Sequence, residues 1–367
     1  MMKFTAGQIS RFAFVYLVSE PLVFFVGRLM KLSTYQGWIT LLGACLLSSL
    51  LLYLTVKLGQ IHPESSWVEF GSRILGKQMH NVFLLLVLLL SIYLISLDVT
   101  NFSTFIGSMY LVETPMWLIM SLTVLCISLS TRTGLEAIIY MGEGIFLVIL
   151  FSSLVTSPMM ITSSNAGMMM ALLTHHDLKR GVLDSFSALA WFSEWIFFLF
   201  TAPFVTFGKK LFRGLLMSLI STIVFISLFW LICLINFGPY LGQQLRYPIL
   251  EVVRVARYGD FLDNLDPFLI AFWSSTMFIR SSFLLYVASV CLSKLVGFSD
   301  RRRTVFLLGS ISGTFAMQYA GHTTNYEVDT RTYAVLAFVL SIELLPIYYL
   351  FVYKIRSLKV KHKNKPI

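Results

Sequence analysis

Six ionisable residues fall inside long apolar stretches of this 367-residue chain: Glu20, Asp98, Glu143, Glu194, Arg280 and Glu343. On insertion scales, an unpaired charge at the centre of a membrane helix costs at least ~2.5–3.5 kcal/mol. Several such residues in one chain therefore require a shared polar interior. There the carboxyl groups could bind a ligand or carry a proton, or they could pair with Arg280 and hold helices together. We expect a ligand-binding role for Glu20 and Glu194. For the other four, a structural pair and a gating role both stay open.

Two of these glutamates coincide with signals that interrupt a helix. Residues 8–27 form a mostly apolar run of about twenty residues, a length that crosses a bilayer as a helix. Glu20 and Pro21 fall in its middle, and proline lacks the backbone donor and clashes with the preceding turn. We therefore predict a discontinuous helix whose unwound centre lines a polar site between helices. Glu194, followed by Pro203, repeats the pattern in a second run.

The composition is that of a polytopic membrane protein, with 57% hydrophobic and 13% charged residues and a mean hydropathy of +0.79. The net charge is +10, but the basic residues sit in short loops between apolar runs, which the positive-inside rule explains better than nucleic acid does. The sequence has no P-loop, G-x-G-x-x-G, G-x-S-x-G or H-E-x-x-H motif. We expect no enzymatic activity, no cofactor and no nucleic-acid partner. His175-His176-Asp177 is an isolated loop motif and is not expected to hold a metal.

Ten transmembrane spans are predicted, at about 8–28, 36–56, 81–103, 115–130, 135–157, 184–205, 212–236, 267–291, 304–320 and 332–354. With the N-terminus inside, the loops and tail on that side carry nineteen Lys and Arg residues, and the loops on the other side carry eight. The positive-inside rule then places both termini in the cytoplasm, with a basic tail at 355–367.

The ten spans divide into five and five. An odd number in each half turns the second half upside down relative to the first, as in inverted-repeat transporters such as LeuT. We predict an all-α polytopic membrane protein, LeuT-like, with a single integral membrane domain over 1–367. Repeat one covers about 8–157 and repeat two about 184–354. Helices 1 and 6, the first of each repeat, are expected to be discontinuous.

A small polar ligand is expected between helices 1, 3, 6 and 8, because the two breaks free backbone groups there. Tyr93 and Leu97 are four residues apart and share one face of helix 3. Ser275 and Phe278 are three residues apart and share one face of helix 8. The predicted ligand-binding residues are Ser19, Glu20, Pro21, Tyr93, Leu97, Trp191, Glu194, Ser275 and Phe278.

Two loops are predicted to contain a short helix. Ser66 to Glu69 fits a capping box, and the apolar residues that follow at helical spacing indicate a helix on the membrane surface. In the second loop, Pro248 suits a first helical position and Gly259 a stop, with apolar residues on one face. We predict a lid helix at 248–258 over the outer mouth.

Several stretches together resemble one family. They are Tyr247–Arg254 (YPILEVVR), Gly259–Asp266 (GDFLDNLD), Trp273 with Arg280, Gly134–Ala137 (GLEA), Trp67–Gly76 (WVEFGSRILG), and Glu194 with Pro203. Their order and spacing are similar to those of the spore germination receptor B subunits, members of the amino acid–polyamine–organocation transporter superfamily. The resemblance extends along nearly the whole chain.

This resemblance implies a subunit of a nutrient receptor in the inner membrane of dormant spores. It would bind an amino acid or similar nutrient and signal germination together with a larger A subunit and a lipoprotein C subunit. Family members commonly have small residues at the first break, where this chain has Ser19-Glu20-Pro21. A ligand with a prominent cationic group, or a protonated Glu20, would fit that departure. The alternative is a secondary transporter of amino acids or amines, coupled to protons or other cations.

Overall fold

The computed structural model describes residues 3–63, 65–161, 167–202, 204–255, 266–321 and 341–363, and within these residues the chain is all-helical. Its long helices are α1 (Ala6–Glu20), α3 (Gly37–Gly59), α5 (Lys77–Met109), α6 (Met116–Thr133), α7 (Leu135–Ile161), α10 (Lys209–Gly242), α12 (Asp266–Val296), α13 (Arg302–Gly321) and α16 (Leu345–Lys363). Shorter helices are α2 (Val26–Leu32), α4 (Trp67–Leu75), α8 (Gly167–Thr174), α9 (Leu178–Leu189) and α11 (Pro248–Val255).

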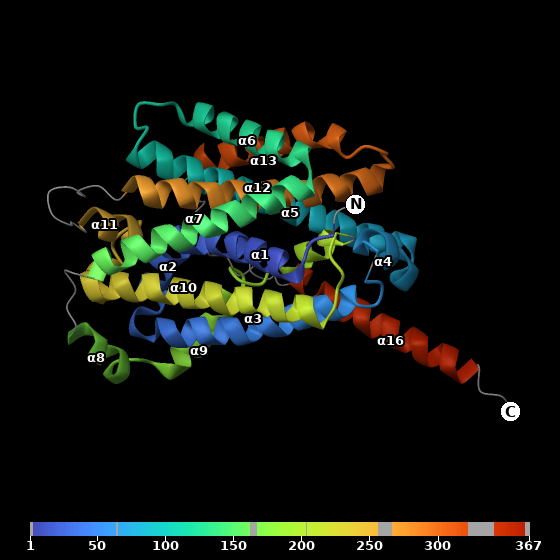
Figure 1. The fold of residues 1–367 in the computed structure, drawn as a ribbon, viewed down its shortest axis with the longest axis horizontal. Helices are drawn as coiled ribbons and strands as arrows, with labels where there is room; N and C mark the ends of the chain where they lie inside the picture. The colour runs from blue at the N-terminus through green and yellow to red at the C-terminus, as the bar shows by residue number, and fades with distance from the viewer. Residues whose placement is uncertain are drawn as a thin grey trace.

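The first helix runs through the centre of the bundle. α6 and α13 lie together on one flank, α3 and α9 on the opposite flank, and α1 lies between them (Figure 1). Every residue from Phe12 to Val23 is buried. By contrast, α7 has long exposed apolar side chains such as Leu147, Phe151 and Leu154. The helix with the mid-span proline is therefore an internal element, as the sequence predicted, and α7 presents an apolar face suited to lipid.

Pro21 does not unwind the first helix. Residues Pro21–Phe25 form a π-helical turn that joins α1 to α2, and the Val26 amide donates to the Pro21 carbonyl. The wider turn accommodates the proline ring and the missing donor while the chain stays helical. The expected unwound centre of helix 1 is therefore corrected to a π-helical turn.

The predicted interruption of helix 6 is a true break. α9 ends at Leu189, residues 193 and 194 have no regular structure, and a 3₁₀ helix follows at Trp195–Thr201. The Ser48 hydroxyl of α3 donates to the freed Phe192 carbonyl at 2.5 Å and accepts from the Trp195 indole nitrogen at 2.8 Å. A neighbouring helix thus satisfies part of the broken backbone, as buried backbone requires. Pro203 lies outside the described residues.

Seven helical segments among the described residues are long and apolar enough to cross a membrane: Ala6–Leu32, Thr34–Gly59, Lys77–Met109, Met116–Thr133, Leu135–Met160, Lys209–Gly242 and Asp266–Val296. These match seven of the ten predicted spans. The predicted span 184–205 is the broken segment, and 304–320 corresponds to α13, which is rich in Gly, Ser and Thr. The predicted span 332–354 lies partly outside the described residues, so the count of ten stays a prediction.

Both predicted loop helices are present, at opposite ends of the bundle. α4 lies at the end where the chain begins and where α16 projects, and α11 lies at the other end (Figure 1). α4 begins after Ser66, whose side chain makes no capping hydrogen bond, so the helix forms without the predicted capping box. α11 buries its apolar face, including Ile249, Val252 and Val253. Residues 256–258 of the predicted lid lie outside the described residues.

Candidate functional site

Arg280, midway along α12, is the centre of a buried charged cluster. Its guanidinium donates through Nη1 to Asp98 Oδ1 of α5 and through Nη2 to Glu194 Oε1 at 2.6 Å. The side chains of Arg280, Asp98 and Glu194 are 5%, 2% and 6% exposed. A planar guanidinium with donors pointing in several directions suits this bridging role better than an ammonium group does. The break in helix 6 lets Glu194 reach this arginine, because it frees the glutamate from regular helical geometry.

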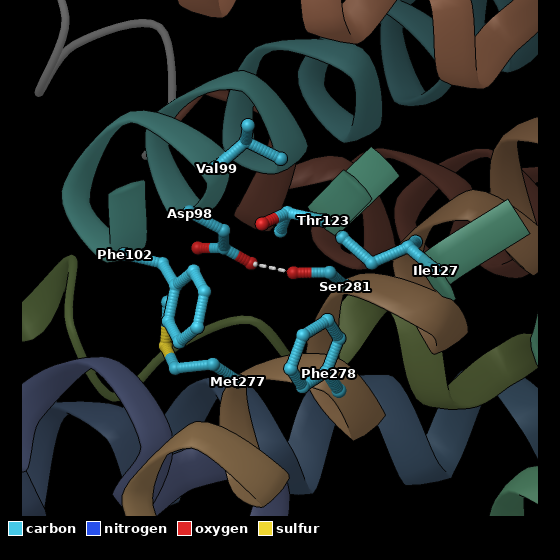
Figure 2. Close-up of a pocket in the computed structure, with 8 residues that line it drawn as sticks. All are labelled: Asp98, Val99, Phe102, Thr123, Ile127, Met277, Phe278 and Ser281. Atoms are coloured by element: carbon cyan, nitrogen blue, oxygen red, sulfur yellow. Dashed lines mark hydrogen bonds between the residues drawn. The ribbon is translucent and has the colours of Figure 1, made fainter. Parts of the chain in front are cut away.

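Two hydroxyl groups complete the cluster. Ser281 Oγ donates to Asp98 Oδ2 at 2.7 Å, as Figure 2 shows. The Tyr16 hydroxyl of α1 donates to Glu194 Oε2 at 2.5 Å, and the Arg280 guanidinium lies 5.5 Å from the centroid of the Tyr16 ring. The cluster therefore ties α1, α5, α12 and the helix break to one another. Movement of any one of these four elements must disturb a charge-assisted hydrogen bond.

Glu20 lies next to this cluster without a cation of its own. Its two carboxylate oxygens both accept from Asn101 Nδ2 of α5, each at 3.3 Å. The carboxyl groups of Glu20 and Asp98 also interact with each other. The Ser19 carbonyl beside the π-helical turn accepts from the Trp273 indole nitrogen at 2.9 Å. Asp98 and Asn101 are three residues apart, so one face of α5 supplies both the partner of Arg280 and the partner of Glu20.

Aromatic side chains close the cluster on two sides. Toward α11, Trp273 contacts Phe24, Phe102 and Phe105 with ring centroids 5.7, 5.8 and 4.8 Å away. Toward the amino end of α1, the Tyr16 ring lies 5.5 Å from that of Phe198 and 5.6 Å from that of Phe283. These two groups of aromatic side chains exclude water, which strengthens the ionic interactions of Arg280 between them.

Two further predicted charges lie apart from Arg280. Glu143 of α7 accepts from the Arg11 guanidinium, with Nε at 3.1 Å, and from Gln8 Nε2 at 3.1 Å. Arg11 is 41% exposed, so this ion pair is near the end of the bundle. Glu343 is buried, and neither of its carboxyl oxygens has a hydrogen-bond partner. It faces the backbone amides of Trp195 and Ile196 at the start of the 3₁₀ helix.

The other predicted ligand-binding residues are spread around the cluster. The Ser19 hydroxyl donates to the Tyr16 carbonyl at 2.7 Å, and Pro21 begins the π-helical turn. The Ser275 hydroxyl donates to the Ala271 carbonyl of its own helix at 2.7 Å. The Trp191 ring packs 5.4 Å from that of Phe25.

On α5, the predicted residue Tyr93 packs against α13. The Tyr93 ring packs 6.5 Å from that of Tyr319 of α13, and Leu97 is half-buried. Sequence reasoning missed Asn101 and Tyr16. Asn101 could have been found from its three-residue spacing to Asp98, whereas no local pattern marks Tyr16 as the partner of Glu194.

A small pocket of about 10 Å³ lies beside the cluster, between α5, α6 and α12. Figure 2 shows its lining residues: Asp98, Val99, Phe102, Thr123, Ile127, Met277, Phe278 and Ser281. Of the predicted residues it contains Phe278, whose ring lies 5.4 Å from that of Phe102, and Asp98. The two α6 residues, Thr123 and Ile127, were not predicted. The wall is apolar except for Thr123 and the Asp98–Ser281 hydrogen bond, and the space is only about as large as one water molecule needs.

The described residues define an all-helical membrane protein with several spans. A solved structure of a Na⁺-coupled sialic acid symporter, in its substrate-bound outward-open state, has the same fold with a TM-score of 0.66. The sequences are 11% identical, and the match covers 94% of this chain and 79% of the symporter. The LeuT-like fold predicted from the sequence is thus supported at the level of overall architecture.

The sequence comparisons then give the family. The model of a family described as "Spore germination protein" matches residues 3–324. Spore germination protein KB of Bacillus subtilis (strain 168) is 22% identical over 345 residues, which is 90% of this chain and 89% of the relative. The chain belongs to the spore germination protein family, and the resemblance read from the sequence is confirmed.

Proposed function

We propose that this chain is the membrane subunit of a spore germinant receptor that binds a small nutrient and passes the signal to partner subunits. The observation that carries the proposal is the buried cluster around Arg280, which joins α1, α5, α12 and the helix break in a member of the spore germination family. A ligand that binds one arrangement of these four elements better than another shifts their equilibrium. The A and C subunits of the receptor would respond to that shift.

The proposed setting is the inner membrane of the spore, with both termini in the cytoplasm. The proposed architecture is ten transmembrane helices in a 5+5 inverted repeat. The start of the chain and the projecting α16 lie toward the same end of the bundle (Figure 1), which supports a common side for the termini. The Lys and Arg residues of the loops predicted on that side make it the cytoplasmic side, by the positive-inside rule.

The proposed ligand is an amino acid or similar nutrient with a cationic group near Glu20. Glu20 is buried, and Asn101 donates a hydrogen bond to its carboxylate. An ammonium group would supply the charge-assisted hydrogen bonds that a buried carboxylate requires. The predicted residues Ser19, Pro21, Trp191 and Glu194, and those on α5 and α12, remain the proposed surroundings of that group.

The test is a germination dose–response curve in spores that carry Glu20→Gln, with immunoblots to match the amount of subunit. Gln keeps the shape and removes the charge, so we expect the nutrient concentration for half-maximal response to rise, or the set of active nutrients to change. Glu143→Gln is the matched control, because Glu143 pairs with Arg11 away from the cluster. An unchanged curve for Glu20→Gln across all active nutrients would assign Glu20 a purely structural role.

Secondary transport is the second candidate, and the likeness to a Na⁺-coupled symporter favours it. The buried carboxyl groups would then carry a coupling proton or hold a cation. Uptake of labelled amino acids into proteoliposomes containing this chain alone would support transport. Nutrient binding without uptake, together with genes for A and C subunits beside this one, would support the receptor.

A further inference from the structure

In and around the buried cluster, acidic groups outnumber basic ones among the described residues. Glu20, Asp98, Glu194 and Glu343 are 7%, 2%, 5% and 1% exposed, and Arg280 is the cation among them in the described residues. Arg280 bonds Asp98 and Glu194, and Asn101 bonds Glu20. Glu343 is left with both oxygens buried and without a hydrogen-bond partner. An ionised carboxylate in that condition would bear the full cost of desolvation.

The surroundings of Glu343 offer no compensating positive charge among the described residues. The nearby carboxyl group of Glu194 carries a negative charge, which disfavours a second one there. The backbone amides of Trp195 and Ile196 face the Glu343 carboxyl but form no hydrogen bond with it.

Among the described residues, the basic groups of α3 and α5 have other partners. Lys57 of α3 lies against the Tyr53 hydroxyl, and His80 of α5 is hydrogen-bonded to Tyr349 at 2.7 Å. Burial therefore decides the state of Glu343, and it favours the neutral acid.

We propose that Glu343 is a proton-binding site at the break in helix 6, neutral while it is buried and ionised when water reaches it. The proton balance is simple: exposure transfers one proton from the Glu343 carboxyl to water, and reburial takes it back. Rising pH then favours any arrangement that exposes Glu343, because the buried arrangement retains a proton that the exposed one releases. The inference rests on the packing around Glu343, and it holds whether the chain signals or transports.

Infrared spectroscopy of the full-length chain in nanodiscs tests the protonation state directly. A neutral carboxylic acid without a hydrogen bond has a carbonyl stretching band that an ionised carboxylate lacks. At pH 8 we expect Glu343→Gln to remove such a band from the spectrum and Glu143→Gln to leave it in place. A spectrum in which Glu343→Gln removes no acid band, and removes carboxylate absorption instead, would overturn the proposal.

Thermal unfolding between pH 6 and pH 9 tests the linkage. Release of one proton on unfolding changes the ratio of folded to unfolded protein by up to tenfold per pH unit, in favour of the unfolded form as pH rises. Glu343→Gln should remove this contribution, so its midpoint should fall less steeply with pH than that of the wild type. Glu143→Gln should follow the wild-type slope, and parallel curves for the wild type and Glu343→Gln would contradict the inference.

Two further outcomes would also count against it. Gln is neutral and close in shape to the protonated acid, so a Glu343→Gln chain that fails to fold would mean that the site requires a charged carboxylate. The second outcome is a sodium effect on the thermal midpoint at fixed pH. If NaCl raised the midpoint of the wild type and choline chloride did not, and neither salt raised that of Glu343→Gln, an alkali ion would neutralise Glu343 in place of a proton.

Discussion

Arg280 and Arg11 each pair with a carboxylate from another helix, but at very different depths. Arg280 is 5% exposed, and its partners Asp98 and Glu194 are 2% and 6% exposed. Arg11 is 41% exposed, and its partner Glu143 is 18% exposed. Water can replace a lost partner at Arg11 but not at Arg280. Two ion pairs of the same residue types should therefore respond to substitution by very different amounts.

The largest effect is expected from Arg280→Met, which leaves Asp98 and Glu194 buried without their cation. Breaking a buried ion pair by removing one partner typically costs about 3–5 kcal/mol. We expect a large drop in the thermal midpoint of the purified chain, measured by fluorescence-detected size exclusion after heating. The thermal midpoint of Arg280→Lys should lie between those of the wild type and Arg280→Met, because an ammonium group keeps the charge but cannot reproduce the bridging geometry of the guanidinium. A midpoint for Arg280→Met close to that of the wild type would mean that the cluster does not hold the bundle together.

A double-mutant cycle separates the pairing energy from the cost of burying charge. In the Arg280→Met background, Asp98→Asn removes one of the two carboxylates left unpaired. We expect the double variant to be more stable than the sum of the single changes, with a coupling of about 0.5–3 kcal/mol. The same cycle with Glu143→Gln in place of Asp98→Asn should be additive, because Glu143 does not contact Arg280. Additive behaviour in both cycles would remove the distinction between the two ion pairs.

The depth of these charges could be predicted from the sequence, whereas their pairing could not. An ionisable residue inside an apolar run must face a protein interior, and this argument found Glu20, Asp98, Glu194, Arg280 and Glu343. It cannot say which helix faces which, because that depends on the rotation of each helix about its axis. The same argument placed Glu143 among them, although Glu143 pairs with Arg11 near the end of the bundle.

The two helix interruptions show the same limit. Proline and a mid-span glutamate marked both, but a local signal does not determine how the backbone responds. At Pro21 the chain absorbs the proline in a π-helical turn. After Leu189 it opens, and Ser48 of α3 bonds the freed Phe192 carbonyl. The partner that makes the opening possible is more than a hundred residues away in sequence, and no local pattern identifies it.

A smaller effect is expected at the lid, where α11 is held by a half-exposed ion pair. Arg254 Nε donates to Asp266 Oδ2 of α12 at 3.0 Å, and Arg254 is 34% exposed. The Tyr110 hydroxyl donates to the same carboxylate oxygen at 3.2 Å, so Asp266 keeps a partner when the arginine is lost. We expect Arg254→Met to cost about 0.2–1 kcal/mol. The measurement is the thermal midpoint at low and at high salt, and a loss as large as that of Arg280→Met would contradict the comparison.

The smallest effect is expected from Glu143→Gln. The carboxylate accepts from both Arg11 and Gln8, and the amide oxygen of Gln can still accept one of these hydrogen bonds. Arg11, left without its partner, is exposed enough to be hydrated, so the change should cost at most about 1 kcal/mol. Salt screens exposed charges, and at about 1 M salt the Debye length is only ~3 Å. The difference in stability between Glu143→Gln and the wild type should therefore shrink further in high salt. The loss of stability caused by Arg280→Met should persist, because ions do not reach a cluster closed by aromatic side chains on two sides. If salt reduced both losses equally, the Arg280 cluster would have to be open to solvent.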